Sequence, residues 1–420
     1  MAFHTNSEHP NERLPKPRGA SAVLQDVARS VSNLAEKVYT DDVQQGASTR
    51  ALESGMGETN GTVYSDTPGN GRVHKSMTVV AEPPTDIRLL LNPVHSSLQQ
   101  VEQKMKSVDG SLFGPLATAF IELIGSGGKR LRPALALMAA ESLAVQSAAQ
   151  AQMRTIAIAA AVEMLHTATL VHDDVIDGAL LRRGAATLNA KWSQSSTVLA
   201  GNYMFARAAH FAAETENVRV IHIFSDTLRI MVNGELRQIF ARNNYLQDKE
   251  SYYERIYAKT ASLFAAATES AAVLMGAPEE VIQELKSFGY HLGMAFQIMD
   301  DILDFVGNAE TLGKPAGSDL RQGTLTLPFF YFVNSHENPS AFVDFMAEQR
   351  ELADEEGEAI WVNTVADIVT AVRSSSAIDA ARAEALDFID AALQNLAGLP
   401  DNIYKQSMAD LCSFVVQRTY

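Results

Sequence analysis

The sequence predicts an all-α fold built as one large domain. From residue 85 to the end, apolar residues recur at spacings of three and four, as in "LRIMVNGELRQIF" (228–240) and "AIDAARAEALDFIDAALQNL" (377–396). This period is typical of amphipathic helices, and the alternation that indicates strands is almost absent. No spacer rich in Pro, Gly or Ser divides residues 81–420, so we treat them as a single helical domain.

Composition limits the kinds of protein this chain can be. It has 420 residues, 46% of them hydrophobic, and can therefore bury a large core. Its formal net charge of −16 argues against a nucleic-acid partner, because nucleic-acid-binding surfaces are basic. A single cysteine, Cys412, excludes a disulfide framework and fits a reducing compartment. The longest apolar run, 156–171, is interrupted by Glu163 and His166, so no transmembrane segment is expected.

Residues 1–80 differ from the rest of the chain. They are rich in Ser, Gly, Asn, Thr and charged residues, and they show no apolar period. Such a composition predicts a disordered N-terminal extension. The first residues lack the apolar core of a secretory signal, so we expect a cytoplasmic protein of bacterial type. A plastid or a mitochondrion is the alternative location if the extension is a transit peptide.

Three aspartates interrupt an apolar segment, "LVHDDVIDGALLRRG" (170–184). On a helix, Asp173 and Asp177 lie one turn apart on one face, and Asp174 lies beside them. A solvated acidic patch is the simplest interpretation of one such triplet. The apolar neighbours disfavour it, because burying an uncompensated charge is costly. We call this segment the first aspartate motif.

The same spacing recurs in "QIMDDILDF" (297–305), where Asp300, Asp301 and Asp304 form the second aspartate motif. Two such motifs on core-facing helices leave six carboxylates that repel one another unless cations lie between them. Magnesium fits, because it prefers oxygen ligands and combines one or two carboxylates with substrate phosphates. Calcium in an EF-hand is the rival, but no loop of that type is present. The sequence therefore predicts a magnesium site for a phosphorylated substrate.

If phosphates complete the metal coordination, basic residues should lie in the same pocket. Short basic segments supply the candidates: Lys129, Arg130 and Arg132 in "GSGGKRLRP", Arg182 and Arg183 after the first motif, Lys259 beside Thr260, and Lys314 in "LGKPAGSDL". Each of them alone is equally typical of a solvated surface. The glycine turn lacks the P-loop pattern and the dinucleotide-binding fingerprint is missing, so neither a nucleotide kinase nor a dehydrogenase is supported.

The ordered set "GGKRLRP", "DDVID…RRG", "KT", "FQIMDDILD" and "GKPAGSDL" resembles the trans-isoprenyl diphosphate synthases (polyprenyl synthetases). The resemblance covers residues 85–420, and 178–192 and 313–328 are more similar to long-chain members such as heptaprenyl, octaprenyl and solanesyl diphosphate synthases. It implies a helical bundle around a deep central cavity, usually as a homodimer. It also implies a head-to-tail condensation of isopentenyl diphosphate onto an allylic diphosphate.

The resemblance assigns roles by position. The two aspartate motifs would hold about three Mg²⁺ ions on the allylic diphosphate. Three basic residues would donate to that diphosphate: Arg182, Lys259 and Lys314. Five would hold isopentenyl diphosphate: Lys129, Arg130, Arg132, His166 and Arg183. Thr260 and Gln297 would face the carbocation, where their dipoles stabilise it. A packed core histidine is the alternative for His166, and a helix-packing amide is the alternative for Gln297.

Product length depends on the residues below the first aspartate motif. Thr169 and Ala168 lie four and five residues before Asp173 and should face the growing chain. Large side chains near this level close the cavity of short-chain relatives. Ala168 leaves it open, so we place the floor near Leu165 or Val162 and expect a product of about C30 to C50. Such a chain suits quinone side-chain synthesis, with peripheral membrane contact for its release.

Other functions share part of this pattern. A short-chain farnesyl or geranylgeranyl diphosphate synthase would differ in cavity depth. Class I terpene cyclases normally mix Asn, Ser or Thr with Glu in the second metal site, and squalene-type enzymes lack "GGKRLRP". A non-catalytic regulatory subunit of a heteromeric synthase usually has lost an aspartate motif. Two residues depart from the resemblance: Asn202 stands where aspartate is common, and Thr324 where lysine is common.

Overall fold

The computed structural model describes residues 86–107, 112–143, 149–182, 184–307 and 315–418. The predicted N-terminal extension, Arg183 and Lys314 lie outside these ranges. The described chain is all-α, as the sequence predicts, apart from one minimal hairpin. In this hairpin β1 (Leu181–Arg182) pairs antiparallel with β2 (Ala185–Ala186). A hairpin of two residues per strand leaves no alternation for the sequence to reveal.

The helices follow one another with short connections. The N-terminal part contains α2 (Ile87–Leu90), the 3-10 turn η1 (Asn92–Val94), α3 (His95–Lys106), α4 (Gly114–Gly125), α5 (Leu131–Leu143) and α6 (Ala149–Ile176). The middle contains α7 (Leu188–Lys191), α8 (Gln194–Ala213), α9 (Val218–Phe240), α10 (Lys249–Ile256), the π-turn η2 (Tyr257–Ala261), α11 (Ser262–Leu274) and α12 (Glu279–Val306). The C-terminal part contains α14 (Ser318–Arg321), α15 (Leu327–Asn334), α16 (Pro339–Glu356), α17 (Ala359–Arg373), α18 (Ala377–Asn395) and α19 (Ile403–Gln417).

Local sequence explains where several helices begin. The segments 228–240 and 377–396, whose apolar period predicts helix, lie in α9 and α18. The Asn217 side chain accepts a hydrogen bond from the N–H of Val220 at the start of α9. The Asn402 side chain does the same for two N–H groups of α19. Such caps satisfy N–H groups that the first helical turn leaves without partners.

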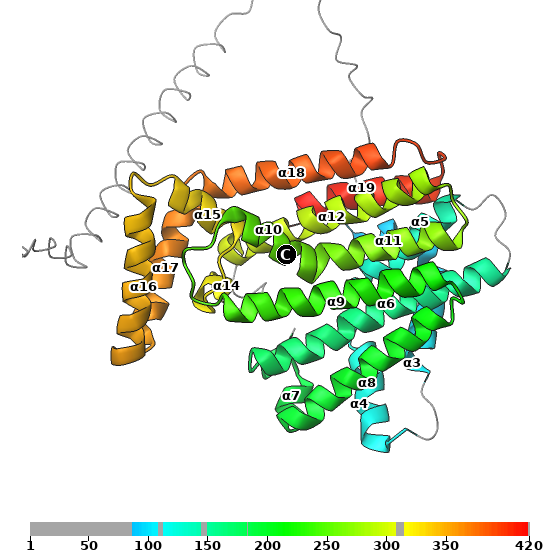
Figure 1. Cartoon of the computed structure of the whole chain (residues 1–420), viewed down its shortest axis with the longest axis horizontal. Coiled ribbons are helices and arrows are strands. Elements are labelled where there is room, and N and C mark those ends of the chain that lie inside the picture. The colour runs from blue at the N-terminus through cyan, green and yellow to red at the C-terminus, as the bar shows by residue number, and fades with distance from the viewer. Residues whose placement is uncertain (1–85, 108–111, 144–148, 183, 308–314, 419–420) are drawn as a thin grey trace, which may run out of the picture.

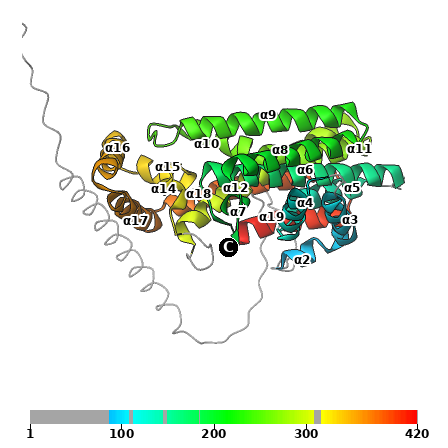
Figure 2. The same ribbon diagram turned by 90° about the horizontal axis from the view of Figure 1, so that it is seen from below.

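Long helices surround the centre of the molecule. Helices α6, α9, α11 and α12 run side by side, α8 packs on α6, and α18 packs on α12 (Figure 1). Helices α16 and α17 stand as a hairpin at one end of this bundle in both ribbon views (Figure 2). Helix α19 packs against α5, α18 and α12, so it brings residue 418, which follows it, back to the bundle.

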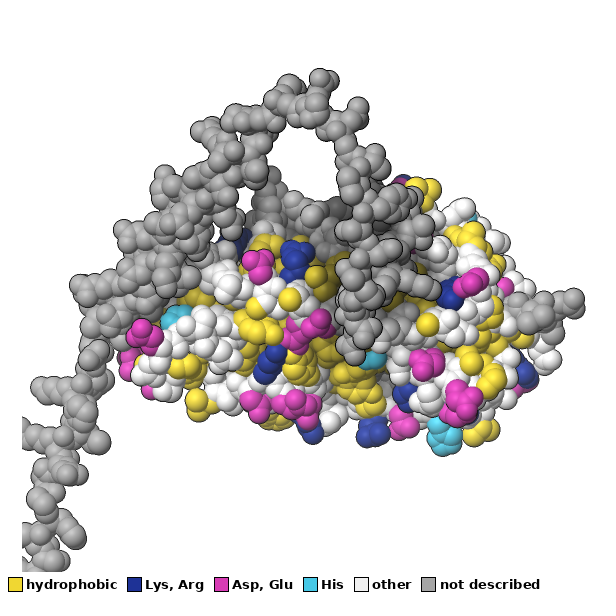
Figure 3. Space-filling model, turned by 90° about the horizontal axis from the view of Figure 1, so that it is seen from above, with side chains coloured by type: hydrophobic (Ala, Val, Ile, Leu, Met, Phe, Trp, Pro, Cys, Tyr) yellow, Lys and Arg dark blue, Asp and Glu magenta, His cyan; other side chains and the backbone are white. Residues whose placement is uncertain are grey.

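Helix α6 is part of the hydrophobic core. In the described part of the chain it is the one helix long and apolar enough to cross a membrane, and 78% of its apolar window is buried inside the protein. Its buried side chains include Val162, Met164 and Leu165, which belong to one continuous hydrophobic cluster. Burial therefore accounts for its apolar composition. On the outer face shown in Figure 3, acidic and basic side chains are interspersed with hydrophobic ones.

Candidate active site

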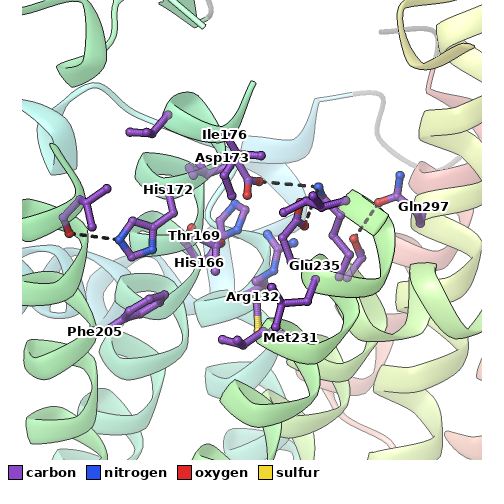
Figure 4. A pocket seen from close by; sticks show the side chains of 18 of the residues that line it. Arg132, His166, Thr169, His172, Asp173, Ile176, Phe205, Met231, Glu235 and Gln297 are labelled. Carbon is purple, nitrogen blue, oxygen red and sulfur yellow. Dashed lines mark hydrogen bonds and ion pairs between the residues drawn. The ribbon is translucent and has the colours of Figure 1, made fainter. Parts of the chain in front are cut away.

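A cavity of about 530 Å³ lies among α6, α8, α9, η2 and α12 (Figure 4). Its polar lining residues are Arg132, His166, Thr169, His172, Asp173, Asn202, Glu235, Lys259, Thr260, Gln297 and Asp300. Its apolar lining residues are Leu170, Val175, Ile176, Val198, Phe205, Met231, Val232, Leu236, Ile239 and Phe296. The cavity therefore joins a charged region to an apolar wall, as a site for a charged molecule with a hydrocarbon tail requires.

The first aspartate motif ends α6, and its three carboxylates point in different directions. Asp173 lines the cavity. Asp174 is buried and accepts a 2.8 Å hydrogen bond from Arg182 Nε. Asp177 accepts a 2.7 Å bond from Arg242 Nη2. Successive helical residues are turned by about 100°, which separates Asp173 from Asp174. In this structure Arg182 anchors Asp174, so its placement on the substrate stays a prediction.

The second aspartate motif shows the same division. Asp300 lines the cavity, and its side chain is 43% exposed. Asp301 and Asp304 are buried and do not line the cavity. The Asp319 backbone N–H donates to Asp304 Oδ2 at 3.2 Å, which ties α12 to α14. The structure thus brings one aspartate of each motif, Asp173 and Asp300, into a common cavity.

Lys259 and Thr260 enter the cavity from a π-turn. The wider turn η2 interrupts the helix between α10 and α11, and such turns often occur at functional sites. Two glycines let neighbouring helices approach it. A Cβ at Gly234 would lie 2.3 Å from Ala258 Cβ, and one at Gly293 would lie 2.6 Å from Ala261 Cα. Close packing on both sides therefore fixes the direction of Lys259 and Thr260.

Lys259 lies between two carboxylates. Its Nζ is 3.8 Å from Asp173 Oδ2 and 3.2 Å from Glu235 Oε2. Figure 4 labels both of these carboxylates. Burial lowers the pKa of Lys259, but the charges of Asp173 and Glu235 outweigh burial and raise it. The ammonium group is therefore charged at neutral pH. It could donate to an oxygen of a diphosphate in the cavity, and this contact would replace its contact with Asp173.

Gln297 belongs to a chain of hydrogen bonds that leads away from the cavity. The Thr260 hydroxyl donates to Gln297 Oε1 at 2.7 Å, and Gln297 Nε2 donates to Asp301 Oδ1 at 2.8 Å. The Tyr252 hydroxyl donates to the other oxygen of Asp301 at 2.8 Å. Asp301 thereby fixes the orientation of the Gln297 amide. Gln297 both lines the cavity and packs within α12, so its two interpretations are compatible.

The glycine turn before α5 separates its three basic side chains. Arg132 lines the cavity, with its guanidinium 4.8 Å from the Phe264 ring centre. Lys129 is exposed, with Nζ 5.7 Å from the Phe414 ring centre. Arg130 has a different partner: its Nη1 lies 2.7 Å from Glu163 Oε1, and it also donates to the Ile124 carbonyl. An ion pair to α6 holds Arg130 away from the residues that line the cavity, so its assignment to substrate stays a prediction without support from this geometry.

Only some of the residues expected to set product length line the cavity. Thr169 and His166 line the cavity, whereas Ala168 and Leu165 are fully buried and do not line it. Ala168 lies one turn before His172, whose ring contacts α8, so it shares the stripe of α6 that faces α8. The expectation that Ala168 faces the cavity is wrong here, because it is turned about 100° from Thr169. Leu165, one turn before Thr169, is buried in the hydrophobic core.

Sequence reasoning missed several residues of the site. Glu235 lines the cavity, and Arg242 holds Asp177. His172 lines the cavity, with Nε2 3.2 Å from the Val198 carbonyl oxygen and its ring 4.9 Å from that of Phe205. Glu235 interrupts the apolar period of 228–240, and this is the one feature of the sequence that could have indicated its role. The others depend on contacts between helices that no local pattern reveals.

Burial changes the acidity of two aspartates. Burial raises the pKa of Asp173 to about 6, against the nearby charge of Lys259. Burial, followed by the charge of Asp319, raises the pKa of Asp301 to about 7, although Gln297 and Tyr252 donate to it. A carboxylate whose charge is this poorly compensated favours a bound cation.

We predict that the metal-free protein loses stability as the pH rises, and that Asp301→Asn removes much of this loss. The folded pKa of Asp301, about 7, exceeds the ordinary 3.8. The protonated Asp301 carboxyl therefore contributes fully to the free energy of unfolding below pH 3.8, and this contribution is lost as the pH rises through 7. The loss is on the order of a few kcal/mol. Thermal unfolding in EDTA from about pH 4 to 8 measures both proteins. Parallel stability profiles would contradict the burial of Asp301.

Known proteins with similar sequences and folds are polyprenyl synthases. Heptaprenyl diphosphate synthase component 2 of Geobacillus stearothermophilus is 37% identical over 334 residues, which cover 80% of this chain and 99% of that protein. The chloroplastic solanesyl-diphosphate synthase 2 of Oryza sativa is 34% identical and covers 84% of this chain and 85% of its own length. A crystal structure of polyprenyl synthase from Caulobacter crescentus, complexed with calcium and isoprenyl diphosphate, superposes with a TM-score of 0.70. It is 33% identical, and the match covers 81% of this chain and all (100%) of that one.

Fold and site together define an all-α prenyltransferase of the isoprenoid synthase type. The conserved sequence profile of the polyprenyl synthetase family matches residues 115–362. The chain belongs to the polyprenyl synthetase family.

Proposed function

We propose that this chain is a magnesium-dependent trans-polyprenyl diphosphate synthase that makes a product of about C30 to C50. It would condense isopentenyl diphosphate head to tail onto an allylic diphosphate, and residues 81–420 would form the catalytic domain. One observation carries the proposal: Asp173 and Asp300, from two different helices, line one cavity that also has basic side chains and an apolar wall. Relatives named heptaprenyl and solanesyl diphosphate synthases support a long product, and quinone side chains would be its use.

The carboxylates of the site fit magnesium. Asp173 and Asp300 offer hard oxygen donors, and the raised pKa of Asp173 shows that its charge is poorly compensated. Asp177 is 30% exposed and follows the end of α6, so it could add a third carboxylate once released from Arg242. When bound there, Mg²⁺ would stabilise the negative charge that develops on the departing diphosphate. Asp174, Asp301 and Asp304 would instead fix the two helix segments that carry these ligands.

The allylic diphosphate would lie beside Lys259. Its ammonium group already pairs with carboxylates, and it would exchange Asp173 for a diphosphate oxygen while Glu235 continues to hold it. Thr260 and Gln297 lie next to Lys259, where their oxygen dipoles would stabilise the allylic cation without capturing it. The hydrocarbon part would extend along the apolar wall formed by α8 and α9.

Isopentenyl diphosphate would be held by a second set of side chains: Arg132, His166 and Lys129. Arg132 and His166 both line the cavity, and Lys129 lies three residues before Arg132. In the condensation, the bond from the allylic carbon to diphosphate breaks, and the isopentenyl double bond forms the new carbon–carbon bond. A proton is then lost to the released diphosphate. Positioning of the unactivated double bond is the main task of Arg132 and His166.

We predict that Thr169→Phe shortens the product toward about C15 to C20, because an aromatic ring would fill the cavity below Asp173. Thr169→Val, nearly the same size, is the matched control and should keep the product length. Ala168→Phe would first have to displace α8, so we expect it to lower thermal stability. Chromatography of dephosphorylated products checks this, and an unchanged length in Thr169→Phe would contradict the assigned wall.

The proposed activity can be tested on the purified chain alone. Incubation with Mg²⁺, an allylic diphosphate and labelled isopentenyl diphosphate should transfer label into hydrophobic product, and EDTA should abolish it. A regulatory subunit would show no transfer until a second chain is added. The name "component 2" of the Geobacillus stearothermophilus relative makes this alternative worth testing.

A homodimer is the assembly that we infer for this chain. Exposed apolar side chains on α8 and α9, including Leu199, Val218, Ile221 and Phe240, would be covered by a second copy. Light scattering should give twice the chain mass of 45.6 kDa. We propose that the protein is cytoplasmic, and a plastid or a mitochondrion is the alternative location.

A further inference from the structure

The C-terminal end of the chain reaches the cavity through Arg418, which directly follows α19. Its side chain is only 3% exposed, and its Nη1 lies 2.8 Å from Asp300 Oδ1. Its Nη2 donates to the Phe296 carbonyl, and its guanidinium carbon lies 3.9 Å from the Phe296 ring centre. Phe296 and Asp300 both line the cavity. A residue at the far end of the sequence thus takes part in the site.

One guanidinium spans a full turn of α12. Phe296 and Asp300 are four residues apart and lie on the same face of the helix. The planar fork of arginine can bond the carbonyl of one and the carboxylate of the other at once, and it keeps its charge at all working pH values. Arg418 is therefore a fixed positive charge on the carboxylate of the second motif that faces the cavity.

We propose that Arg418 is a positioning residue that neutralises Asp300 in the empty site and releases it when a divalent cation binds with a diphosphate. A carboxylate oxygen that bonds the guanidinium is not free to bind the cation, so the ion pair competes with the metal. The inference rests on the proposed function in one respect, that Asp300 holds the cation. It gives the C-terminal residues a role in setting the affinity of the second motif.

Titration of the protein with Mg²⁺ in the presence of inorganic diphosphate, followed by calorimetry, tests this competition. Arg418→Gln should bind Mg²⁺ about three- to tenfold more tightly than the unmodified protein, which is the effect of removing one partly exposed ion pair. Arg219→Gln is the matched control, because Arg219 pairs with Glu279 at the opposite end of α12. It should leave the affinity unchanged. Unchanged or weaker binding in Arg418→Gln would overturn the proposal.

A second measurement needs no metal. In EDTA, a thermal unfolding cycle with Arg418→Gln, Asp300→Asn and the double variant should show that the two effects are not additive, because both remove the same ion pair. If Arg418→Gln does not fold, Arg418→Lys keeps a charge without the fork, and its Mg²⁺ affinity should also rise. Additive effects in the cycle would overturn the ion pair. If the unmodified protein failed to bind Mg²⁺ with diphosphate, the proposed metal site would be wrong, whatever the cycle shows.

Discussion

Asp173→Asn is expected to lower kcat/KM by about a thousandfold or more while the protein stays folded, because the loss removes several kcal/mol of metal-derived stabilisation from the departing diphosphate. Asparagine keeps the size of the side chain and one oxygen donor but loses the charge. The fold should tolerate it, because burial already makes the Asp173 charge costly and raises its pKa to about 6. Asp300→Asn should have an effect of the same kind, because Asp300 is the cavity-facing residue of the second motif.

Initial rates at saturating and limiting Mg²⁺ measure this loss, with circular dichroism as the check on folding. Asp226→Asn is the matched control. Asp226 lies on α9, pairs with Arg229 at 3.2 Å, and is 62% exposed away from the cavity lining. It should keep near-normal rates. Near-normal turnover in Asp173→Asn would refute the assignment of the first motif.

Arg132→Gln should raise the KM for isopentenyl diphosphate about ten- to a hundredfold, because a charge-assisted contact to its diphosphate is lost. The KM for the allylic primer should change much less, since we propose that Lys259 and the aspartate motifs bind the other diphosphate. A larger rise for the primer would show that the two diphosphate sites are exchanged.

Arg130→Gln is the informative comparison. Arg130 is only two residues from Arg132, but it pairs with Glu163 and does not line the cavity. Breaking this buried pair should destabilise the protein by about 3 to 5 kcal/mol, since Glu163 keeps an uncompensated charge. The KM values should change little at a temperature where the variant is folded. Thermal unfolding and kinetics together separate the two arginines, which the sequence alone placed in one group.

The fold could be predicted from the sequence because its signal is local. The apolar period of three and four predicted the helices that became α9 and α18, and the near absence of alternation excluded a sheet. The spacing of the aspartates also placed both motifs on helices, and one carboxylate of each faces the same cavity. Local spacing fixes which residues share a helix face.

The direction of each side chain could not be predicted in the same way. Asp174 was expected on metal and Arg182 on substrate, yet they bond each other, and Asp301 bonds Tyr252 of α10. Ala168 and Thr169 are neighbours in sequence but face different helices. These outcomes depend on how α6 and α12 are rotated against their partners, which tertiary packing decides. Arg418 is the clearest case, because it meets Asp300 only after α19 folds back onto α12.

The length of the product made by the unmodified chain tests the central claim most directly. The purified protein, Mg²⁺, an allylic diphosphate and an excess of labelled isopentenyl diphosphate should yield an all-trans polyprenyl diphosphate, whose dephosphorylated alcohol is separated by reversed-phase chromatography. We predict a distribution centred at about C30 to C50, because the cavity that Asp173 and Asp300 line also has an apolar wall and relatives are named as long-chain synthases. A product of C20 or shorter, or no condensation product from the chain alone, would contradict the account.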